Sequence, residues 1–427
     1  MGEGPVARRR GVTPPAGRTV ARADTPTSPV RTRLLERTAE RVMLAAAKRI
    51  RAGTLTVELP GGDIRQFGGS SDGPTATLRL HDPKGAVRLL VAGDTGAGEA
   101  YVDGLWSSPD LPQLAKLASI NRDALALTSG WWRAPAKVAR TVAHRARRNT
   151  VGGARRNIEA HYDLGNDFYR LFLDETMTYS SAVFQTPEQS LADAQRNKYR
   201  LMAERAGLEP GQHVLEIGTG WGGFALYAAG ELGCRVTTTT ISPAQHALAT
   251  ERVRAAGLED RVTLLLRDYR ELEGSYDAIV SIEMFEAVGE RYWPVFFAEC
   301  DRLLQPGGAI GLQTITMSHS RYLATRRAYT WVKKYVFPGG AIPSRPAIDA
   351  AMARASALRV TADREIGLHY ARTLRGWRER FLSRVDEAHA LGFGDTFVRM
   401  WELYLAYCEA GFATGAIGDA QLRLERR

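Results

Sequence analysis

Glycines at alternating positions form the segment of this chain best suited to hold a small molecule. Gly218, Gly220 and Gly222 directly follow the aliphatic run 214–217, and a helix-like, alanine-rich stretch follows them. Glycine lets a backbone turn sharply and lets a ligand lie directly against it. The spacing differs from the G-x-G-x-x-G that places a pyrophosphate on a helix N-terminus. The segment predicts a strand, a ligand-binding turn and a helix, with a glycine-rich turn that holds no ligand as the alternative.

The elements that position this turn alternate between strand and helix periodicity. Strands are expected at 214–217, 235–241, 261–266, 278–282 and 309–315, with helices between them at 222–232, 243–256 and 292–304. This alternation predicts an α/β fold with a doubly wound parallel sheet. Ligands bind such sheets beyond the carboxyl ends of the strands, which is where the glycines lie.

The rest of the chain suggests three regions. Residues 1–30 are rich in Pro and Arg and predict a disordered basic tail. Residues 31–150 predict a smaller α+β domain, with helices at 31–51 and 111–124 and strands at 54–59 and 76–80. Residues 151–427 would form the main domain, with an insertion at 318–346 and aromatic-rich helices at 370–384 and 395–412.

The net charge of +10 predicts a polyanionic partner, either nucleic acid or an anionic bilayer surface. Residues 131–156 combine two tryptophans with many arginines, which is typical of a segment at a membrane interface, although an ordinary solvated helix is the alternative. No apolar run reaches the length of a membrane span and no signal peptide is evident. The three cysteines lie far apart, so we expect no metal site, no disulfide and a cytoplasmic setting.

Several motifs follow one another in the order of a known family. They are His161-Tyr-Asp-Leu-Gly-Asn-Asp-Phe-Tyr169, Met177-Thr-Tyr-Ser-Ser-Ala182, the glycine turn with Glu216 before it, Thr240-Ile-Ser-Pro-Ala-Gln245, Arg267-Asp-Tyr-Arg270, Ser281-Ile-Glu-Met-Phe-Glu-Ala-Val-Gly289 and Lys334-Tyr-Val-Phe-Pro-Gly-Gly340. Together they resemble the cyclopropane fatty acid synthase and mycolic acid methyltransferase family, which are class I S-adenosylmethionine (AdoMet) methyltransferases. The resemblance runs from about 155 to 415, and more weakly through the N-terminal region.

Within the family, residues 283–289, 313–317 and 400–407 look like the actinobacterial enzymes of tuberculostearic acid synthesis. Those enzymes methylate carbon 10 of an oleoyl chain in a phospholipid and leave a 10-methylene group, which a separate reductase saturates. The resemblance implies an unsaturated phospholipid acyl chain as substrate and a peripheral place on the inner face of the membrane. It leaves a homo-oligomer open, and a cyclopropane synthase that closes a ring at the same double bond is the alternative.

The resemblance also implies the residues that contact AdoMet. Tyr179 and Ser180 would close over its methionine part, and Glu216, Gly218, Thr219 and Gly220 would line the turn beneath it. Thr240, Ser242 and Gln245 would follow the second strand, where many methyltransferases have a carboxylate for the ribose. Asp268 and Tyr269 would border the adenine, with helix capping as the alternative role for Asp268.

The family holds a bicarbonate ion as the base, and this chain matches its ligands in part. Glu286, Ile315 and Tyr370 match, whereas Ser181 stands for a Cys and Gln313 for a His. Ala287 replaces a further His. Ser and Gln form hydrogen bonds but do not titrate near neutral pH. Cys408 matches a cysteine proposed as catalytic in the family, and an inert buried thiol is the alternative.

The chemistry requires positioning in a dry cavity, because an isolated alkene is a weak nucleophile. Methyl transfer leaves a carbocation, which must be shielded from water and must then lose a proton. Immediate loss with ring closure gives a cyclopropane, while a hydride shift before the loss gives a methylene branch. Fewer titratable groups at the base favour the slower methylene route.

Two other classes of protein share some features of this sequence. A nucleic-acid methyltransferase would suit the charge, but the chain has no D/N-P-P-Y/F motif and no Pro-Cys nucleophile. We therefore expect no nucleic-acid partner. A degenerate AdoMet-fold scaffold is disfavoured by the intact glycine turn with Glu286 and Tyr370.

Overall fold

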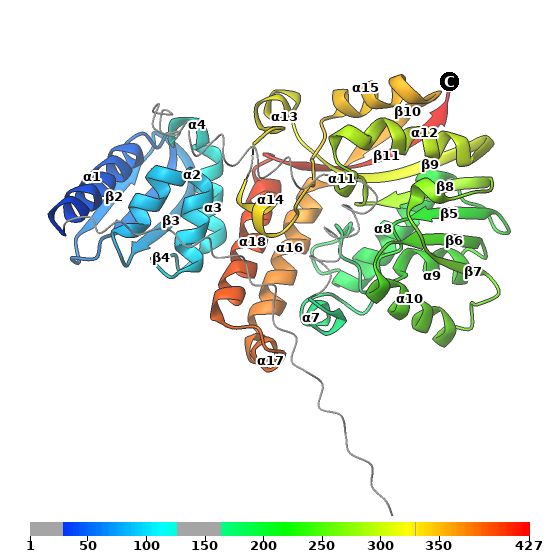
Figure 1. Ribbon diagram of the computed structural model, residues 1–427, viewed down its shortest axis with the longest axis horizontal. Helices are drawn as coiled ribbons and strands as arrows, with labels where there is room; N and C mark the ends of the chain where they lie inside the picture. The colour runs from blue at the N-terminus through cyan, green and yellow to red at the C-terminus, as the bar shows by residue number, and fades with distance from the viewer. Residues whose placement is uncertain (1–28, 126–163, 329) are drawn as a thin grey trace, which may run out of the picture.

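The computed structural model describes residues 29–125, 164–328 and 330–427 (Figure 1). Most of the predicted basic tail, the basic segment 131–156 and the first three residues of the motif at 161–169 lie outside these ranges. The predicted boundary between residues 150 and 151 lies outside them as well.

A seven-stranded sheet forms the larger part of the molecule. Its strand order is β10-β11-β9-β8-β5-β6-β7, and β5 to β9 run parallel, while β11 is antiparallel to both of its neighbours. The strands are β5(His213–Ile217), β6(Arg235–Thr240), β7(Val262–Leu266), β8(Tyr276–Ile282), β9(Leu304–Thr316), β10(Leu358–Glu365) and β11(Gly418–Arg426). The doubly wound sheet and its five parallel strands confirm the sequence prediction; β10 and β11 were not predicted.

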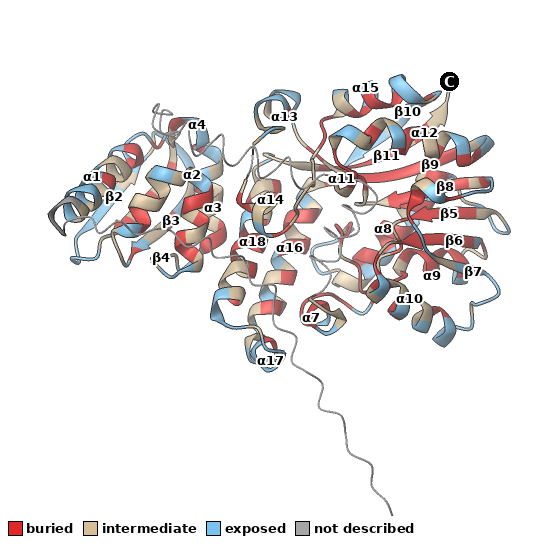
Figure 2. Ribbon diagram, viewed as in Figure 1, coloured by how far each residue is buried: buried red, intermediate tan, exposed pale blue. Residues whose placement is uncertain are grey.

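Helices cover both faces of this sheet, as expected when strands alternate with helices. α8(Leu191–Ala206), α9(Gly223–Gly230) and α10(Pro243–Ala255) share a core with Val214 and Val236. α12(Trp293–Leu303) and α15(Arg345–Ala355) share a second core with Leu215 and Ile279. Neighbouring residues of β5 thus point to opposite cores, and Figure 2 shows the central strands buried.

A second, four-stranded sheet lies near the N-terminus, in the order β2-β1-β3-β4. Its elements are α1(Pro29–Ala47), β1(Ala52–Glu58), β2(Ile64–Gly68), β3(Ser71–Leu80), α2(Lys84–Val102), β4(Trp106–Ser107), α3(Leu111–Ile120) and α4(Arg122–Leu125). Ile50, Leu55, Val57 and Leu117 form its core. The helices and strands expected here are present; β2, β4 and α2 are additional.

Two long C-terminal helices lie between the two sheets (Figure 1). α16(Gly367–Leu382) and α18(Asp395–Ala413) are joined by the short helix α17(Val385–Ala390). Tyr101 of α2 donates a hydrogen bond to Glu402 of α18 at 2.7 Å. Arg399 of α18 in turn donates to the carbonyl of Tyr101 at 2.8 Å. These contacts attach the N-terminal sheet to the larger one.

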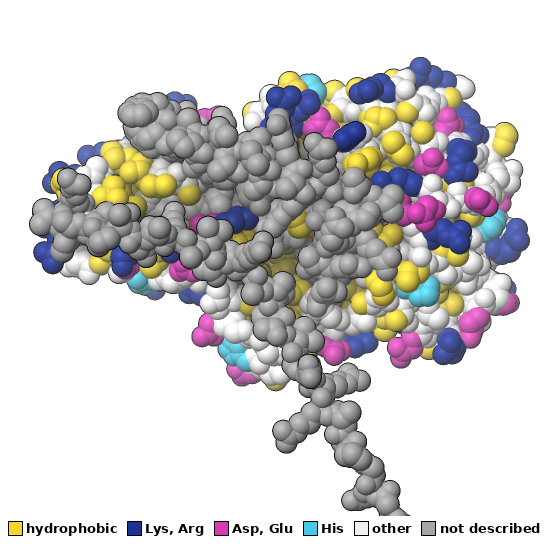
Figure 3. Space-filling model, viewed as in Figure 1, with side chains coloured by type: hydrophobic (Ala, Val, Ile, Leu, Met, Phe, Trp, Pro, Cys, Tyr) yellow, Lys and Arg dark blue, Asp and Glu magenta, His cyan; other side chains and the backbone are white. Residues whose placement is uncertain are grey.

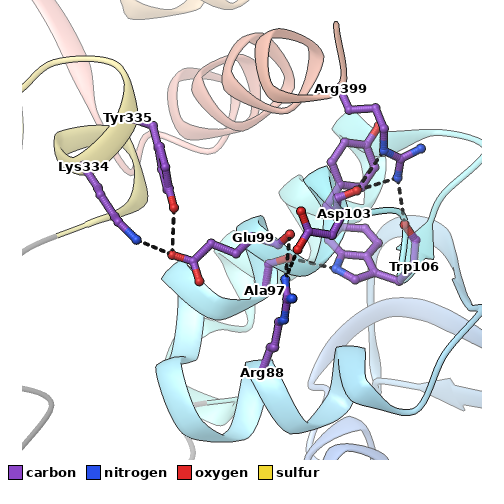
Figure 4. A network of polar contacts seen from close by, with 9 residues as sticks. Arg88, Ala97, Glu99, Asp103, Trp106, Lys334, Tyr335 and Arg399 are labelled. Carbon is purple, nitrogen blue, oxygen red and sulfur yellow. Dashed lines mark hydrogen bonds and ion pairs between the residues drawn. The ribbon is translucent and has the colours of Figure 1, made fainter. Parts of the chain in front are cut away.

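The insertion after β9 makes a second attachment (Figure 4). It contains α13(His319–Thr325) and α14(Trp331–Tyr335). Lys334 and Tyr335 both donate to Oε1 of Glu99 in α2, at 2.5 and 2.9 Å. The remaining short elements are α7(Asn166–Arg170), η2(Tyr269–Glu271), α11(Phe285–Val288) and η3(Glu290–Tyr292). Among the described helices, none combines the length and apolar character needed to span a bilayer.

Candidate active site

One continuous cavity of about 410 Å³ opens at the carboxyl ends of the parallel strands. The glycine turn after β5, the segments that follow β6 to β8 and residues of α16 and α18 line it. Asp94 of α2 and Arg122 of α4 also line it, so the N-terminal sheet unit contributes to its wall. The cavity therefore joins the predicted cofactor turn to the predicted base site.

The glycine turn leaves room for a ligand at one position. Gly218, Gly220 and Gly222 have φ angles of +106°, +52° and +85°. A Cβ at 218 would lie 3.0 Å from Cβ of Met284, so close packing and the positive φ together favour glycine there. A Cβ at Gly220 would meet no protein atom within 4 Å. Because Gly220 lines the cavity, the open space above it fits a cofactor lying against the backbone.

Glu216, at the end of β5, anchors a buried network under the turn. Its Oε2 accepts a hydrogen bond from Thr238 at 2.6 Å, and the Thr238 hydroxyl lies 2.7 Å from that of Thr219. Burial raises the pKa of Glu216 to about 8. The carboxyl also lines the cavity, and its raised pKa means that it keeps its proton to a higher pH than a solvated glutamate does.

The predicted contacts after β6 lie close together. Thr240 donates to Oε1 of Gln245 at 2.8 Å, and both residues line the cavity. Ser242 is the N-cap of α10 and accepts from the backbone of Gln245. The hydrogen bond of Ser242 therefore caps the helix. Ser242 itself is adjacent in sequence to a residue of the cavity wall.

After β7, Asp268 both lines the cavity and caps a turn. It accepts from the backbone N–H of Arg270 at 3.1 Å, and from its guanidinium at 2.8 and 2.7 Å. This is the capping geometry named above as the alternative. Tyr269 also lines the cavity, and its buried hydroxyl has no partner among the described residues. A bound ligand could therefore satisfy it.

The loop before α8 closes the other side of the cavity. The hydroxyls of Tyr179 and Tyr404 lie 2.8 Å apart. Ser180 accepts from Nζ of Lys198 at 2.7 Å. Lys198 is fully buried in α8, and burial lowers its pKa to about 8 although nearby acids, Glu283 first, oppose the shift. This lysine was not predicted, since nothing in its sequence context separates it from a surface residue.

The base site contains a carboxyl that was not predicted. Oε1 of Glu283 accepts from the backbone N–H of Ser181 and from Nε2 of Gln313, both at 2.8 Å. Oε2 accepts from the hydroxyl of Tyr370 at 2.6 Å. Gln313 also donates to Asp419 of β11 at 3.2 Å. Three of the residues assigned to bicarbonate by resemblance therefore meet around Glu283.

Glu286 lies beside this group and has different partners. Its Oε1 accepts from Thr314 at 2.8 Å and from the backbone N–H of Ile315. Its Oε2 is buried and has no partner within the described part of the chain. Burial, with the charge of Glu283 adding to it, raises the pKa of Glu286 to about 8. The predicted residues are thus brought together as two adjoining sets, one around each glutamate.

Cys408 lines the same cavity from α18. Burial raises the pKa of its thiol to about 12, so the group is a neutral thiol at physiological pH. The thiolate is the nucleophilic form. This environment favours the inert-thiol alternative.

Only one of the two unpredicted acids, Glu283, has a signal in the sequence. Glu283 stands three residues before Glu286, after the same strand, and could have been considered with it. Asp419 belongs to β11, where charged residues obscure the alternating pattern of a strand. No feature of the sequence therefore singled out Asp419.

The fold and the turn define the class of this protein. The sheet is doubly wound and contains one antiparallel strand, β11, and the glycine turn after β5 leaves space for a ligand. These are the features of class I AdoMet-dependent methyltransferases. The chain belongs to the mycolic acid cyclopropane synthetase family, whose sequence pattern matches residues 150–422.

Individual relatives agree with this membership. The tuberculostearic acid methyltransferase UfaA1 of Mycobacterium tuberculosis is 44% identical over 366 residues, which cover 84% of this chain and 85% of the relative. The cyclopropane-fatty-acyl-phospholipid synthase of Escherichia coli is 34% identical, over 79% of this chain and 84% of its own. The crystal structure of mycolic acid cyclopropane synthase CmaA1 complexed with SAH and CTAB superposes with a TM-score of 0.59 at 31% identity, over 64% of this chain and 98% of that one.

Proposed function

We propose that this protein transfers a methyl group from AdoMet to the double bond of an oleoyl chain in a phospholipid, leaving a 10-methylene branch. The observation that carries the proposal is the single cavity that runs from the open space at Gly220 to Glu283, Glu286 and Tyr370. A cofactor and an alkene held in one cavity can meet in line, which is the main requirement of this reaction.

Bound AdoMet would supply an electrophilic methyl group on a sulfonium. The glycine turn, Glu216 and Thr219 would hold it from below, with Tyr179 and Ser180 on the other side. Tyr179, Tyr370 and Tyr404 would enclose the alkene and keep water from the cation that forms on it. Each aromatic face can stabilise a cation by about 0.5–2 kcal/mol.

Basic residues in the cavity wall favour a phospholipid over an uncharged lipid. Arg122, Arg321 and Lys333 line it, together with Arg326, which forms an ion pair with Glu290 at 2.8 Å. Burial, with the charge of Arg122 adding to it, lowers the pKa of Arg321. Cations gathered in this way favour a bound anion, and the phosphate of a headgroup would supply one.

The two enzyme classes among the relatives differ in product. The higher identity of the tuberculostearic acid methyltransferase, together with Gln313 and Ser181 at positions where the family has titratable groups, supports the methylene product. The cyclopropane synthase keeps ring formation as the competing outcome. A saturated branch would then require a separate reductase.

Expression in a bacterial host that makes no cyclopropane fatty acids, supplied with oleate, should give a C19 chain with a methylene branch. Mass spectrometry of the fatty esters would detect the added carbon. Proton NMR would then show vinylidene protons and no upfield ring protons. Ring protons alone would return the protein to the cyclopropane synthases, and a mixture would mean that the barriers of the two routes differ by about 1.4 kcal/mol or less.

We also propose that the protein acts on the inner face of the membrane through the basic segment 131–156. On the face seen in Figure 3, Lys and Arg of the described residues are interspersed with Asp and Glu rather than gathered in one patch. The concentrated positive charge is in residues 131–156 of the sequence.

Replacing Arg145, Arg147 and Arg148 with alanine should weaken sedimentation with anionic vesicles and reduce its dependence on salt. Each basic residue near such a surface contributes about 1 kcal/mol. A triple replacement of the exposed Arg254, Arg359 and Arg364 by alanine removes equal charge elsewhere and serves as the control. Equal binding of the wild type to neutral and anionic vesicles would contradict the proposal.

A further inference from the structure

Glu283 has a backbone conformation that side chains rarely adopt. Its φ is +50°, and within the described residues only Met177 shares a positive φ without being glycine. Both residues line the cavity. Such conformations persist where the surrounding structure enforces them, and they are concentrated at functional sites. The conformation turns the Glu283 carboxyl inward at the end of β8 instead of leaving it on the surface.

The carboxyl of Glu283 is surrounded by donors and by acids that retain their protons. Ser181, Gln313 and Tyr370 supply three hydrogen bonds to it. Burial, followed by the charge of Glu283, raises the pKa of Asp419 and of Tyr370 well above their ordinary values. Tyr370 therefore remains a donor. An ionised carboxylate is a pure acceptor, so this set of partners suits a charged Glu283.

Glu283 also lies next to the cofactor turn. Ser281 of the same strand donates to the carbonyl of Ile217 at 2.9 Å. Met284 packs so closely on Gly218 that a Cβ there would be 3.0 Å away. Glu283 thus stands between two residues that contact the cofactor strand and turn, its carboxyl is bonded to Tyr370, and it lines the cavity in which methyl transfer would form the cation.

We propose that the side chain of Glu283 is the proton acceptor of this enzyme and that it replaces a bound bicarbonate. The inference rests on the proposed function. After the alkene has taken the methyl group and a hydride has shifted, a C–H bond of the new methyl breaks. Its electron pair forms the methylene double bond, and the proton goes to a carboxylate oxygen of Glu283. The resulting acid returns the proton to solvent when the product leaves.

Bicarbonate does not fit the site as it is built. Ser181, Gln313 and Tyr370 already bind Glu283, and the backbone N–H of Ile315 binds Glu286. Four of the five positions that the resemblance assigned to bicarbonate thus donate to side-chain carboxyls, and the fifth, Glu286, is one of these carboxyls. A free anion would compete with the carboxylate of Glu283 for the same donors and would be repelled by it.

The test compares Glu283→Gln with Glu283→Gly. Glutamine fills the space without accepting a proton, whereas glycine suits the positive φ and opens a carboxylate-sized space beside the same donors. We expect each variant to lose at least 100-fold in turnover, with AdoMet affinity within threefold of wild type. Added bicarbonate should restore at least tenfold in Glu283→Gly and raise its melting temperature, and should do neither in Glu283→Gln or wild type.

Several results would overturn the inference. One is turnover in Glu283→Gln within tenfold of wild type; another is stimulation of the wild type by bicarbonate in buffer freed of carbon dioxide. Loss of turnover in Glu283→Gly with neither rescue nor a shift in melting temperature would assign Glu283 a structural role. A wild type that binds AdoMet but methylates no oleoyl phospholipid would instead refute the proposed function, so the two failures are distinguishable.

Discussion

Gly220→Val is expected to abolish AdoMet binding while the protein remains folded. The space above Gly220 is open to the cavity, and a branched side chain would occupy it. The φ of +52° adds strain, since an L residue in this region costs about 1–2 kcal/mol. That cost lowers the melting temperature but does not unfold a domain of this size. Isothermal calorimetry should show at least a 100-fold weaker affinity.

Gly257→Val separates strain from loss of the cofactor site. Gly257 has a φ of +66°, a Cβ there would also meet no atom within 4 Å, and the residue does not line the cavity. This variant should lose a similar amount of stability and should bind AdoMet as the wild type does. Unchanged affinity in Gly220→Val would place the cofactor elsewhere.

The parallel sheet could be predicted because its strands are buried on both faces and bounded by helices. Such strands appear in the sequence as short apolar runs such as 214–217 and 278–282. β10 and β11 could not be predicted in the same way. Charged residues such as Arg359, Arg364 and Arg423 interrupt them, and pairing with β9, distant in the sequence, holds β11 in place. The acid Asp419 was missed along with its strand.

Prediction of the base site was incomplete for a different reason. Resemblance identified Ser181, Gln313 and Tyr370 from three separate segments, and the structure does bring them together. The resemblance did not identify the group that these three residues bind. That depends on the backbone of Glu283, whose positive φ turns the side chain toward them, and hydrophobic periodicity carries no information about a single left-handed residue.

Glu286→Gln is expected to make the protein more stable than wild type at alkaline pH. In the folded protein the pKa of Glu286 is raised to about 8, from an ordinary value of 4.5. Between these values the folded state keeps a proton that the unfolded state has lost. Wild-type stability therefore falls as pH rises through this window, whereas glutamine cannot ionise. The difference should be small at pH 5 and reach about 2–4 kcal/mol above pH 8.

Thermal unfolding from pH 5 to pH 9 would measure this difference. Glu283 and Asp419 lie near Glu286 and are present in both proteins, so the difference between the two curves reports the charge of Glu286 and its coupling to them. Glu259→Gln removes the same charge from an exposed position and should follow the wild type throughout. Parallel curves for Glu286→Gln and wild type would mean that Glu286 is ionised at neutral pH. Glu283 and Glu286 would then be two adjacent carboxylates, and Glu283 would not be the single charged acceptor of this pair.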